Sequence, residues 1–216
     1  MKRLLSFVLS LLFVTACTQK IAECACYQGI GSDSGDKPIQ TFTFSNNKSV
    51  SVCGYDGDEL ISEFNVFDCE NGESLVEYGA LKMCTISFEN DKVVITQMLY
   101  LPNNDAWELE YVPFAQETIA AEGDKLKVEP RKPLTFTSSI SGQVQDDFLN
   151  SFEPLNLQSE DITEELLLKL EALALSGKAT AVEILKEIGN TYPLDGAVHE
   201  TFNWSMEHIE FQNQQE

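Results

Sequence analysis

Residues 84–101, CTISFENDKVVITQMLYL, indicate the fold of this chain most directly. Apolar side chains recur at every second position from Cys84 to Phe88, and a side-chain period of two is typical of a β-strand. The pair Asn90-Asp91 follows as a turn, and a second apolar run begins two residues later. Two apolar segments joined by a short polar turn predict an antiparallel β-hairpin.

The same pattern recurs on both sides of this stretch. Residues 41–44 and 49–52 alternate around a polar turn, which predicts a second hairpin. Shorter strand candidates lie at 63–66, 107–111, 126–128 and 134–137. Seven or eight short strands with frequent turns predict an antiparallel β-sandwich or barrel-like region over residues 39–150.

After about residue 150 the apolar period becomes that of an α-helix. Apolar stripes of helical spacing lie near 162–174, 181–188 and 198–209. Asp161 with Glu164 is typical of an N-cap with its capping-box partner, and Gly189-Asn190 is a candidate C-cap. Short helices are stable chiefly through packing of an apolar face. We therefore expect an α+β fold in which residues 151–216 form a bundle of about three short helices, packed on the β region.

The first twenty residues, MKRLLSFVLSLLFVTACTQK, have the organisation of a secretory signal. Lys2 and Arg3 form a positive region, and the apolar run from Leu4 to Ala16 is shorter than the roughly 20 residues that a membrane span needs. The run ends in Val14-Thr15-Ala16-Cys17, which resembles the lipobox of bacterial lipoproteins. An ordinary signal peptide, with the cysteine there by chance, is the alternative.

The resemblance implies that signal peptidase II cleaves between Ala16 and Cys17 and that Cys17 is acylated. Residues 1–16 would then be removed, and residues 17–38 would form a lipidated tether and loop. Acyl chains would hold the mature chain at a membrane of the bacterial cell envelope. By analogy with the sorting rule of well-studied lipoproteins, Thr18 in place of Asp favours the outer membrane, with the periplasmic or surface face left open.

The chain is strongly acidic. It has 14 Lys and Arg against 35 Asp and Glu, a formal net charge of −21. Nucleic-acid binding depends on basic side chains that neutralise phosphates, so this charge argues against it. A basic protein or another cationic ligand fits the charge. So does the simpler interpretation that negative charge keeps a secreted domain soluble.

Five cysteines are left if Cys17 is lipidated. They are Cys24, Cys26, Cys53, Cys69 and Cys84. In an oxidising envelope this number predicts two disulfides and one odd thiol, without fixing the pairs. Cys84 shares the strand parity of Phe88, so it is also a candidate for a buried free cysteine. Cys24 and Cys26 could act as a redox dithiol or bind a soft metal. We favour a structural role that attaches the N-terminus to the sheet, because the CxxC spacing is absent.

Known catalytic and metal-binding motifs are incomplete in this chain. His199 and His208 are nine residues apart, which places them on opposite sides of a straight helix and prevents a shared site. The HExxH motif that begins at His199 fails at Asn203. Asp56 and Asp58 lie in an acidic turn and are weak calcium candidates, because the EF-hand spacing is not met there.

Aromatic residues leave two interpretations open. Trp107, Tyr111 and Trp204 could form a surface for sugar stacking or protein binding, although their period-two or helical placement predicts core packing. The sequence favours a membrane-anchored, non-enzymatic protein, without a cofactor, that acts in binding, as an accessory or as an immunity-like protein through its acidic surface. One alternative is a small carboxylate-based hydrolase of envelope glycans. Another is a thiol redox or metal-handling protein that uses Cys24 and Cys26.

Overall fold

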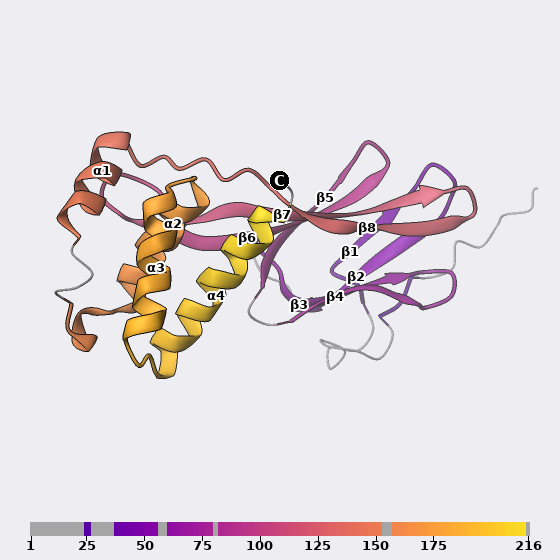
Figure 1. Ribbon diagram of the computed structural model, residues 1–216. Helices are drawn as coiled ribbons and strands as arrows, with labels where there is room; N and C mark the ends of the chain where they lie inside the picture. Colours follow the sequence, from indigo (N-terminus) through magenta and orange to yellow (C-terminus); the bar gives the residue numbers. More distant parts are fainter. Residues whose placement is uncertain (1–23, 27–36, 56–59, 80–81, 153–156, 215–216) are drawn as a thin grey trace, which may run out of the picture.

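The computed structural model describes residues 24–26, 37–55, 60–79, 82–152 and 157–214. These ranges contain eight β-strands followed by four α-helices, so the α+β class and its order along the chain are confirmed (Figure 1). The predicted signal peptide and the lipidation site at Ala16 and Cys17 lie outside the described residues. So do the weak calcium candidates Asp56 and Asp58.

The strands form two four-stranded sheets. The first sheet has the order β1 (Gln40–Thr43), β2 (Ser49–Tyr55), β3 (Ser62–Asp68) and β4 (Ser74–Tyr78). The second has the order β5 (Met83–Glu89), β6 (Lys92–Pro102), β7 (Leu109–Glu122) and β8 (Lys125–Pro133). Every neighbouring pair is antiparallel, so each sheet is a meander of consecutive strands.

The two sheets form a β-sandwich whose inner faces share one apolar core. Its fully buried members are Val50, Val52, Phe64, Val66, Cys84, Val93, Ile95 and Ile119. They come from both sheets and follow the period of two that the sequence predicted. The predicted antiparallel β-sandwich is therefore confirmed, and its core is enclosed between the two packed sheets.

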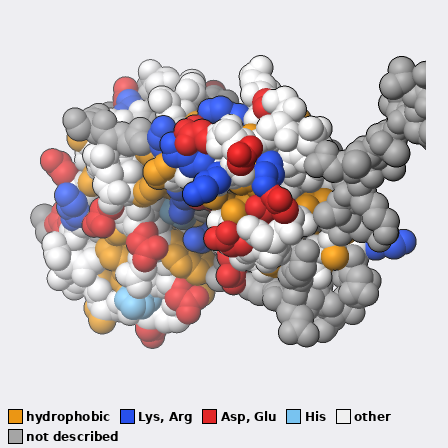
Figure 2. Space-filling view, turned by 90° about the vertical axis from the view of Figure 1, so that its right-hand side faces the viewer, with side chains coloured by type: hydrophobic (Ala, Val, Ile, Leu, Met, Phe, Trp, Pro, Cys, Tyr) orange, Lys and Arg blue, Asp and Glu red, His pale blue; other side chains and the backbone are white. Residues whose placement is uncertain are grey.

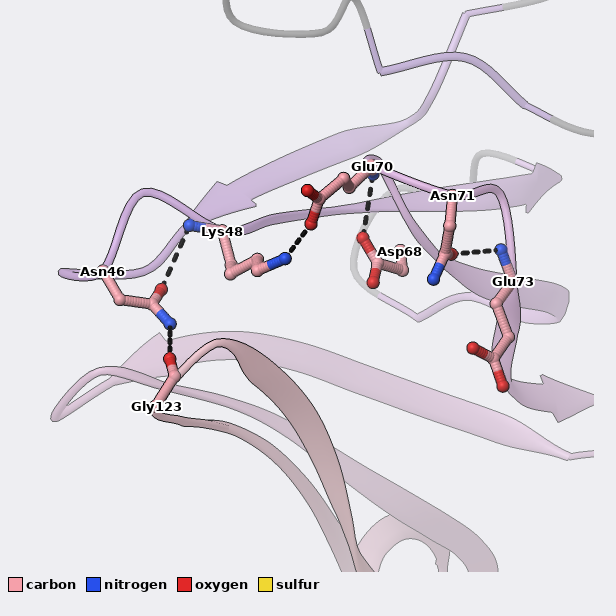
Figure 3. A network of polar contacts seen from close by, with 7 residues as sticks. All are labelled: Asn46, Lys48, Asp68, Glu70, Asn71, Glu73 and Gly123. Atoms are coloured by element: carbon pink, nitrogen blue, oxygen red, sulfur yellow. Dashed lines mark hydrogen bonds and ion pairs between the residues drawn. The ribbon is translucent and has the colours of Figure 1, made fainter.

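Polar turns join the two sheets at the end of the sandwich away from the helices (Figure 1). Ser45 donates from its backbone N–H and its hydroxyl to the Asp91 carboxylate, at 2.8 and 2.7 Å. Figure 3 shows Asn46 of the β1–β2 turn donating to the carbonyl oxygen of Gly123 in the β7–β8 turn, at 2.6 Å. Its other amide atom, Oδ1, accepts from the N–H of Lys48, so one side chain orders its own turn and ties it to the second sheet.

Strands β6 and β7 are the longest in the described chain, and they extend beyond the sandwich toward the helices (Figure 1). On one face of β6, Val93 and Ile95 are in the sandwich core, whereas Leu99 and Leu101 are in the core shared with the helices. Strand β5 begins at Met83, opposite Met98, so within the described ranges β6 beyond Met98 pairs only with β7. A β-bulge in the β6–β7 pair lies at the same place.

The helices are α1 (Gly142–Ser151), α2 (Glu164–Leu175), α3 (Ala179–Thr191) and α4 (Gly196–Asn213), with a 3-10 turn at Ser159–Asp161. The three predicted stripes correspond to α2, α3 and α4. The count of about three was one short, because α1 lies almost entirely within residues 39–150, which the sequence assigned to the β region. Its sequence GQVQDDFLNS is mostly polar, and Phe148 and Leu149 provide its contact with the helical core.

Two predicted helix caps were wrong. Thr163, not Asp161, caps α2: its hydroxyl oxygen accepts from the N–H of Leu166 at 3.2 Å, whereas Asp161 accepts from Gln158 within the 3-10 turn. Gly189 lies inside α3 and has a different role. A Cβ there would come within 2.4 Å of the Phe202 ring, so glycine permits the close approach of α4.

Strand predictions failed where alternation was short or continued into a loop. Residues 134–137 are not a strand, although Phe136 is buried. Strand β4 and most of β7 were not predicted, and Trp107 lies in a turn before β7 with a positive φ of 60°. Within the described part of the chain, no helix has both the length and the apolar content to cross a membrane.

Candidate functional site

A groove of about 520 Å³ lies where the second sheet meets α2 and α4. Its strand side consists of residues 97–101 of β6, with Lys82 and Met83 at one end and Tyr111 of the neighbouring strand. Glu164, Leu168 and Glu171 line it from α2, and Thr201, Trp204, Glu207 and His208 line it from α4. The helix residues recur every three or four positions, so each helix turns one face to the groove.

The most unusual property of this groove is its exposed aromatic surface. Five large hydrophobic residues are exposed in the described ranges, and three of them line the groove: Tyr100 (50%), Tyr111 (45%) and Trp204 (45%). Tyr100 and Tyr111 are cross-strand partners, and their ring centroids lie 4.7 Å apart. Clustered exposed aromatic side chains are typical of a binding surface. The expectation of core packing was therefore wrong for Tyr111 and Trp204.

Trp107 behaves differently from these three residues. It is half-buried against Phe148, with ring centroids 5.0 Å apart, and the Lys169 ammonium lies 5.5 Å from its ring centroid. It does not line the groove. The structure thus separates the aromatic residues that the sequence had grouped together, and it adds Tyr100.

A buried polar network lies beside the groove and joins α2 to α4. The Glu171 side chain is only 3% exposed, and its Oε1 lies 2.7 Å from Nδ1 of His208. Its other oxygen, Oε2, accepts from the hydroxyl of Ser205 at 2.7 Å. Because an ionised carboxylate only accepts hydrogen bonds, His208 donates through Nδ1. The network gives the buried carboxylate a donor on each oxygen, as its burial requires.

The two histidines do not share a site. His199 is exposed and interacts with Asn203 of the same helix at 3.2 Å, while His208 packs edge-on against the Phe114 ring, with centroids 4.8 Å apart. Sequence reasoning missed Glu171, the partner of His208. One signal was present, since Glu171 is a charged residue inside the apolar run LLLKLEALAL of α2.

Two carboxylates in the groove have no partner among the residues that the structure describes. Glu164 and Glu207 are exposed, and neither forms a hydrogen bond or ion pair within the described ranges. Lys82 is the single lysine or arginine among the described residues that line the groove. The groove therefore presents aromatic rings together with unneutralised negative charge.

The acidic character of the chain is not uniform over its surface. Figure 2 shows basic and acidic side chains together on one face, with hydrophobic side chains exposed between them. Four basic residues belong to β8 alone: Lys125, Lys127, Arg131 and Lys132. Pro130 and Pro133 lie in the same strand. Charged side chains and prolines on an edge strand discourage pairing with another chain.

The cysteines take structural positions. Cys24 is bonded to Cys69 and Cys26 to Cys53, whereas Cys84 is a buried free thiol. The prediction of two disulfides and one odd thiol is therefore confirmed. The two bonds attach residues 24–26 to the first sheet, at β2 and just after β3. A redox or metal-binding role for Cys24 and Cys26 would require both bonds to be reduced.

Burial also determines the chemistry of Cys84. Desolvation raises the pKa of its thiol to about 12, although the positive charges of Arg131 and Lys82 act in the opposite direction. A thiol that stays protonated at neutral pH is a poor nucleophile and a poor metal ligand. The described residues contain no group of three or more His, Cys, Asp or Glu side chains placed to bind a metal.

Comparisons with protein families, with curated proteins and with solved structures found no match.

Proposed function

We propose that this protein is a lipid-anchored, non-enzymatic binding protein of the bacterial cell envelope, and that the aromatic groove holds its ligand. The exposure of Tyr100, Tyr111 and Trp204 in one groove carries this proposal. Covering about 100 Å² of each ring with a ligand would contribute roughly 2.5 kcal/mol per ring, at about 25 cal/mol per Å². A protein without a ligand gains nothing from leaving these rings uncovered.

The lipobox supports the anchoring part of the proposal. Acylation of Cys17 would keep the groove near a membrane, the outer one being favoured, and would raise its local concentration for partners there. The acidic chain and the two free groove carboxylates favour a basic protein or another cationic ligand. An accessory or immunity-like role, in which the protein holds a partner, follows from these features.

Anchoring is tested by metabolic labelling with an alkyne analogue of palmitate. Wild-type protein should incorporate the label and fractionate with membranes, whereas Cys17→Ser should do neither. A Cys17→Ser protein that still carries the label, or that still fractionates with membranes, would overturn the anchor. This outcome would not contradict ligand binding in the groove.

Binding in the groove is tested by photocrosslinking in intact envelopes. Benzoylphenylalanine replaces Trp204 in one variant and Glu210 in the other, and both positions are exposed on α4. Glu210 does not line the groove, so it is the matched control. A discrete adduct should form from position 204 alone. Equal adducts at both positions, or none at either, would contradict a ligand in the groove.

A hydrolase of envelope glycans is the second candidate, and the Glu171–His208 contact favours it. A carboxylate on Nδ1 orients a histidine so that Nε2 can accept a proton from water, and His208 lines the groove. Release of soluble fragments from purified peptidoglycan by wild-type protein, lost in a folded His208→Gln variant, would support this function. No release from peptidoglycan would reject it.

A further inference from the structure

The groove runs along a part of β6 that has no strand on one side among the residues that the structure describes. Strand β5 begins opposite Met98, so Leu99–Pro102 pair with β7 on one side only. Residues 97–101 line the groove. The open edge of the sheet and the aromatic groove are therefore the same place.

Backbone geometry shows which groups face this open side. In an antiparallel pair, the N–H and C=O of one residue point to the same side, and successive residues alternate. Cys84 uses both groups to bond Ile61, at 2.8 Å each, so they point away from β6. The backbone N–H and C=O of its neighbour Met83 therefore point toward β6. Those of Met98, the partner of Met83, point toward β5.

The alternation places the backbone of Tyr100 on the open side. Tyr100 lies two residues after Met98, so its backbone N–H and C=O point to the same side as those of Met98. The β5–β6 pairing does not extend as far as Tyr100. Asn103, of the other parity, donates its N–H to the Glu108 carbonyl across the β6–β7 pair at 3.1 Å, which agrees with this assignment. In the described part of the chain, no hydrogen bond occupies the N–H or C=O of Tyr100 on this side.

This edge differs from the protected edge of the same sheet. The open stretch LYLP carries apolar and aromatic side chains, whereas β8 is rich in lysine and proline. Met98 already pairs with Met83, and Pro102 lacks an N–H, so a new strand could form one complete pair of backbone hydrogen bonds here, with the N–H and C=O of Tyr100. Such a short site suits a short extended segment and not a long sheet.

We propose that the groove takes an extended, basic segment of a partner protein, which adds as a strand beside β6 and pairs with the backbone of Tyr100. The inference rests on the proposed function, because it names the ligand class for the same groove. Backbone pairing would supply affinity, and pockets for alternate side chains would supply specificity. A Lys or Arg of the segment would meet the free carboxylate of Glu164 or Glu207 and the face of Trp204. A second acidic copy of this chain would be repelled.

The test begins with a displayed library of random decapeptides, from which peptides that bind the wild-type protein are selected. The random library assumes nothing about the sequence of the partner. Selected peptides should be enriched in Lys and Arg. Their affinities are then measured by Trp204 fluorescence in a Trp107→Phe background, where Trp204 is the single tryptophan left. Replacing the basic residue by Glu should weaken binding at least tenfold.

Backbone methylation of the peptides decides whether they add as a strand. N-methylation at alternate residues on the edge that faces β6 should weaken binding at least tenfold, and methylation on the opposite edge should change it less than threefold. On the protein side, Tyr100→Pro removes the open N–H while Tyr100→Ala keeps it, so the proline variant should bind more weakly than the alanine variant. The peptide series uses unaltered protein and stands even if Tyr100→Pro does not fold.

Several outcomes would overturn strand addition. They are the absence of selected peptides, equal effects of methylation on both edges, and enrichment of acidic peptides. A dimer at micromolar concentration that Tyr100→Pro converts to monomer would also overturn it, because the occupant would then be a second copy. If the crosslink from position 204 persists in any of these cases, the groove still binds a ligand and only its assigned class is wrong. Loss of the crosslink rejects the groove itself.

Discussion

The two halves of the β6–β7 pair have the same strands and the same faces, but different surroundings. In the sandwich half, Val93 and Ile95 lie under the first sheet, and β5 occupies the edge of β6. In the other half, Leu99 and Leu101 lie under helices, and no described strand occupies the edge of β6. Helices can cover the face of a strand, but they do not form hydrogen bonds with the backbone N–H and C=O groups along its edge. One half is therefore closed on its face and on its edge, whereas the other half has backbone groups without a partner in the described chain, where we propose that a ligand binds.

The largest expected effect belongs to the sandwich half. Ile95 is fully buried there, so Ile95→Ala should lower the free energy of unfolding by about 2–5 kcal/mol through lost apolar contact and a cavity. Urea denaturation at equilibrium measures it. Thr96→Ala on the other face of β6 is the control and should cost less than about 1 kcal/mol. If Ile95→Ala also lowers the free energy of unfolding by less than about 1 kcal/mol, Ile95 does not belong to the stabilising core.

A smaller effect is expected for the network that joins α2 to α4 behind the groove. His208→Ala leaves one oxygen of the buried Glu171 without its donor, which should cost about 1–3 kcal/mol. The exposed His199 on the same helix is a matched control, and His199→Ala should change stability by less than about 0.5 kcal/mol. Equal effects in thermal unfolding would show that the network contributes nothing to helix docking.

The free thiol of the sandwich core should affect stability only in alkaline solution. Folding raises the pKa of Cys84 from 9.0 to about 12, so above pH 9 the unfolded chain releases this proton more readily than the folded one. Stability from this group is therefore complete below pH 9 and is lost as pH rises toward 12. Tyr78, whose pKa is raised by burial and by the nearby Glu117, acts in the same direction. Cys84→Ala should flatten the fall in stability between pH 9 and 12, and an unchanged slope would contradict the assignment.

The smallest effect on stability is expected in the groove half. Trp204 is 45% exposed, so Trp204→Ala should change the free energy of unfolding by less than about 1 kcal/mol. The same variant should lose most of the affinity for peptides selected on the wild-type protein, because covered aromatic rings dominate many binding surfaces. Calorimetric titration with those peptides measures this loss. A variant that unfolds easily but binds normally would assign the ring to packing.

Much of the fold was accessible from local patterns. Period-two alternation predicted the hairpin at 41–52 and the pair β5–β6, because a sandwich strand has one buried face. Helical stripes predicted α2, α3 and α4. The polar helix α1 was missed, because few of its residues contact the core. Strand β4 was missed because only two of its five residues are buried.

The groove was only partly accessible. Tyr111 and Trp204 were recognised as aromatic residues that could bind a ligand, but their spacing favoured burial, and the structure exposes both. Tyr100 was not predicted as a site residue, because its role depends on the β5–β6 pairing, which stops two residues before it at Met98. Glu171 and His208 are 37 residues apart, and their contact exists only because α2 packs on α4.

The sequence by itself determined the α+β class, most of the strands and three of the four helices, how many cysteines pair and the signal-like N-terminus with its lipobox resemblance. These properties depend on neighbours within a few residues of the chain, so a local pattern contains them. The tertiary structure alone decided which cysteines pair, where the edge of β6 opens and which aromatic rings stay exposed. These depend on strand register and helix docking, which bring together residues that lie far apart in the chain.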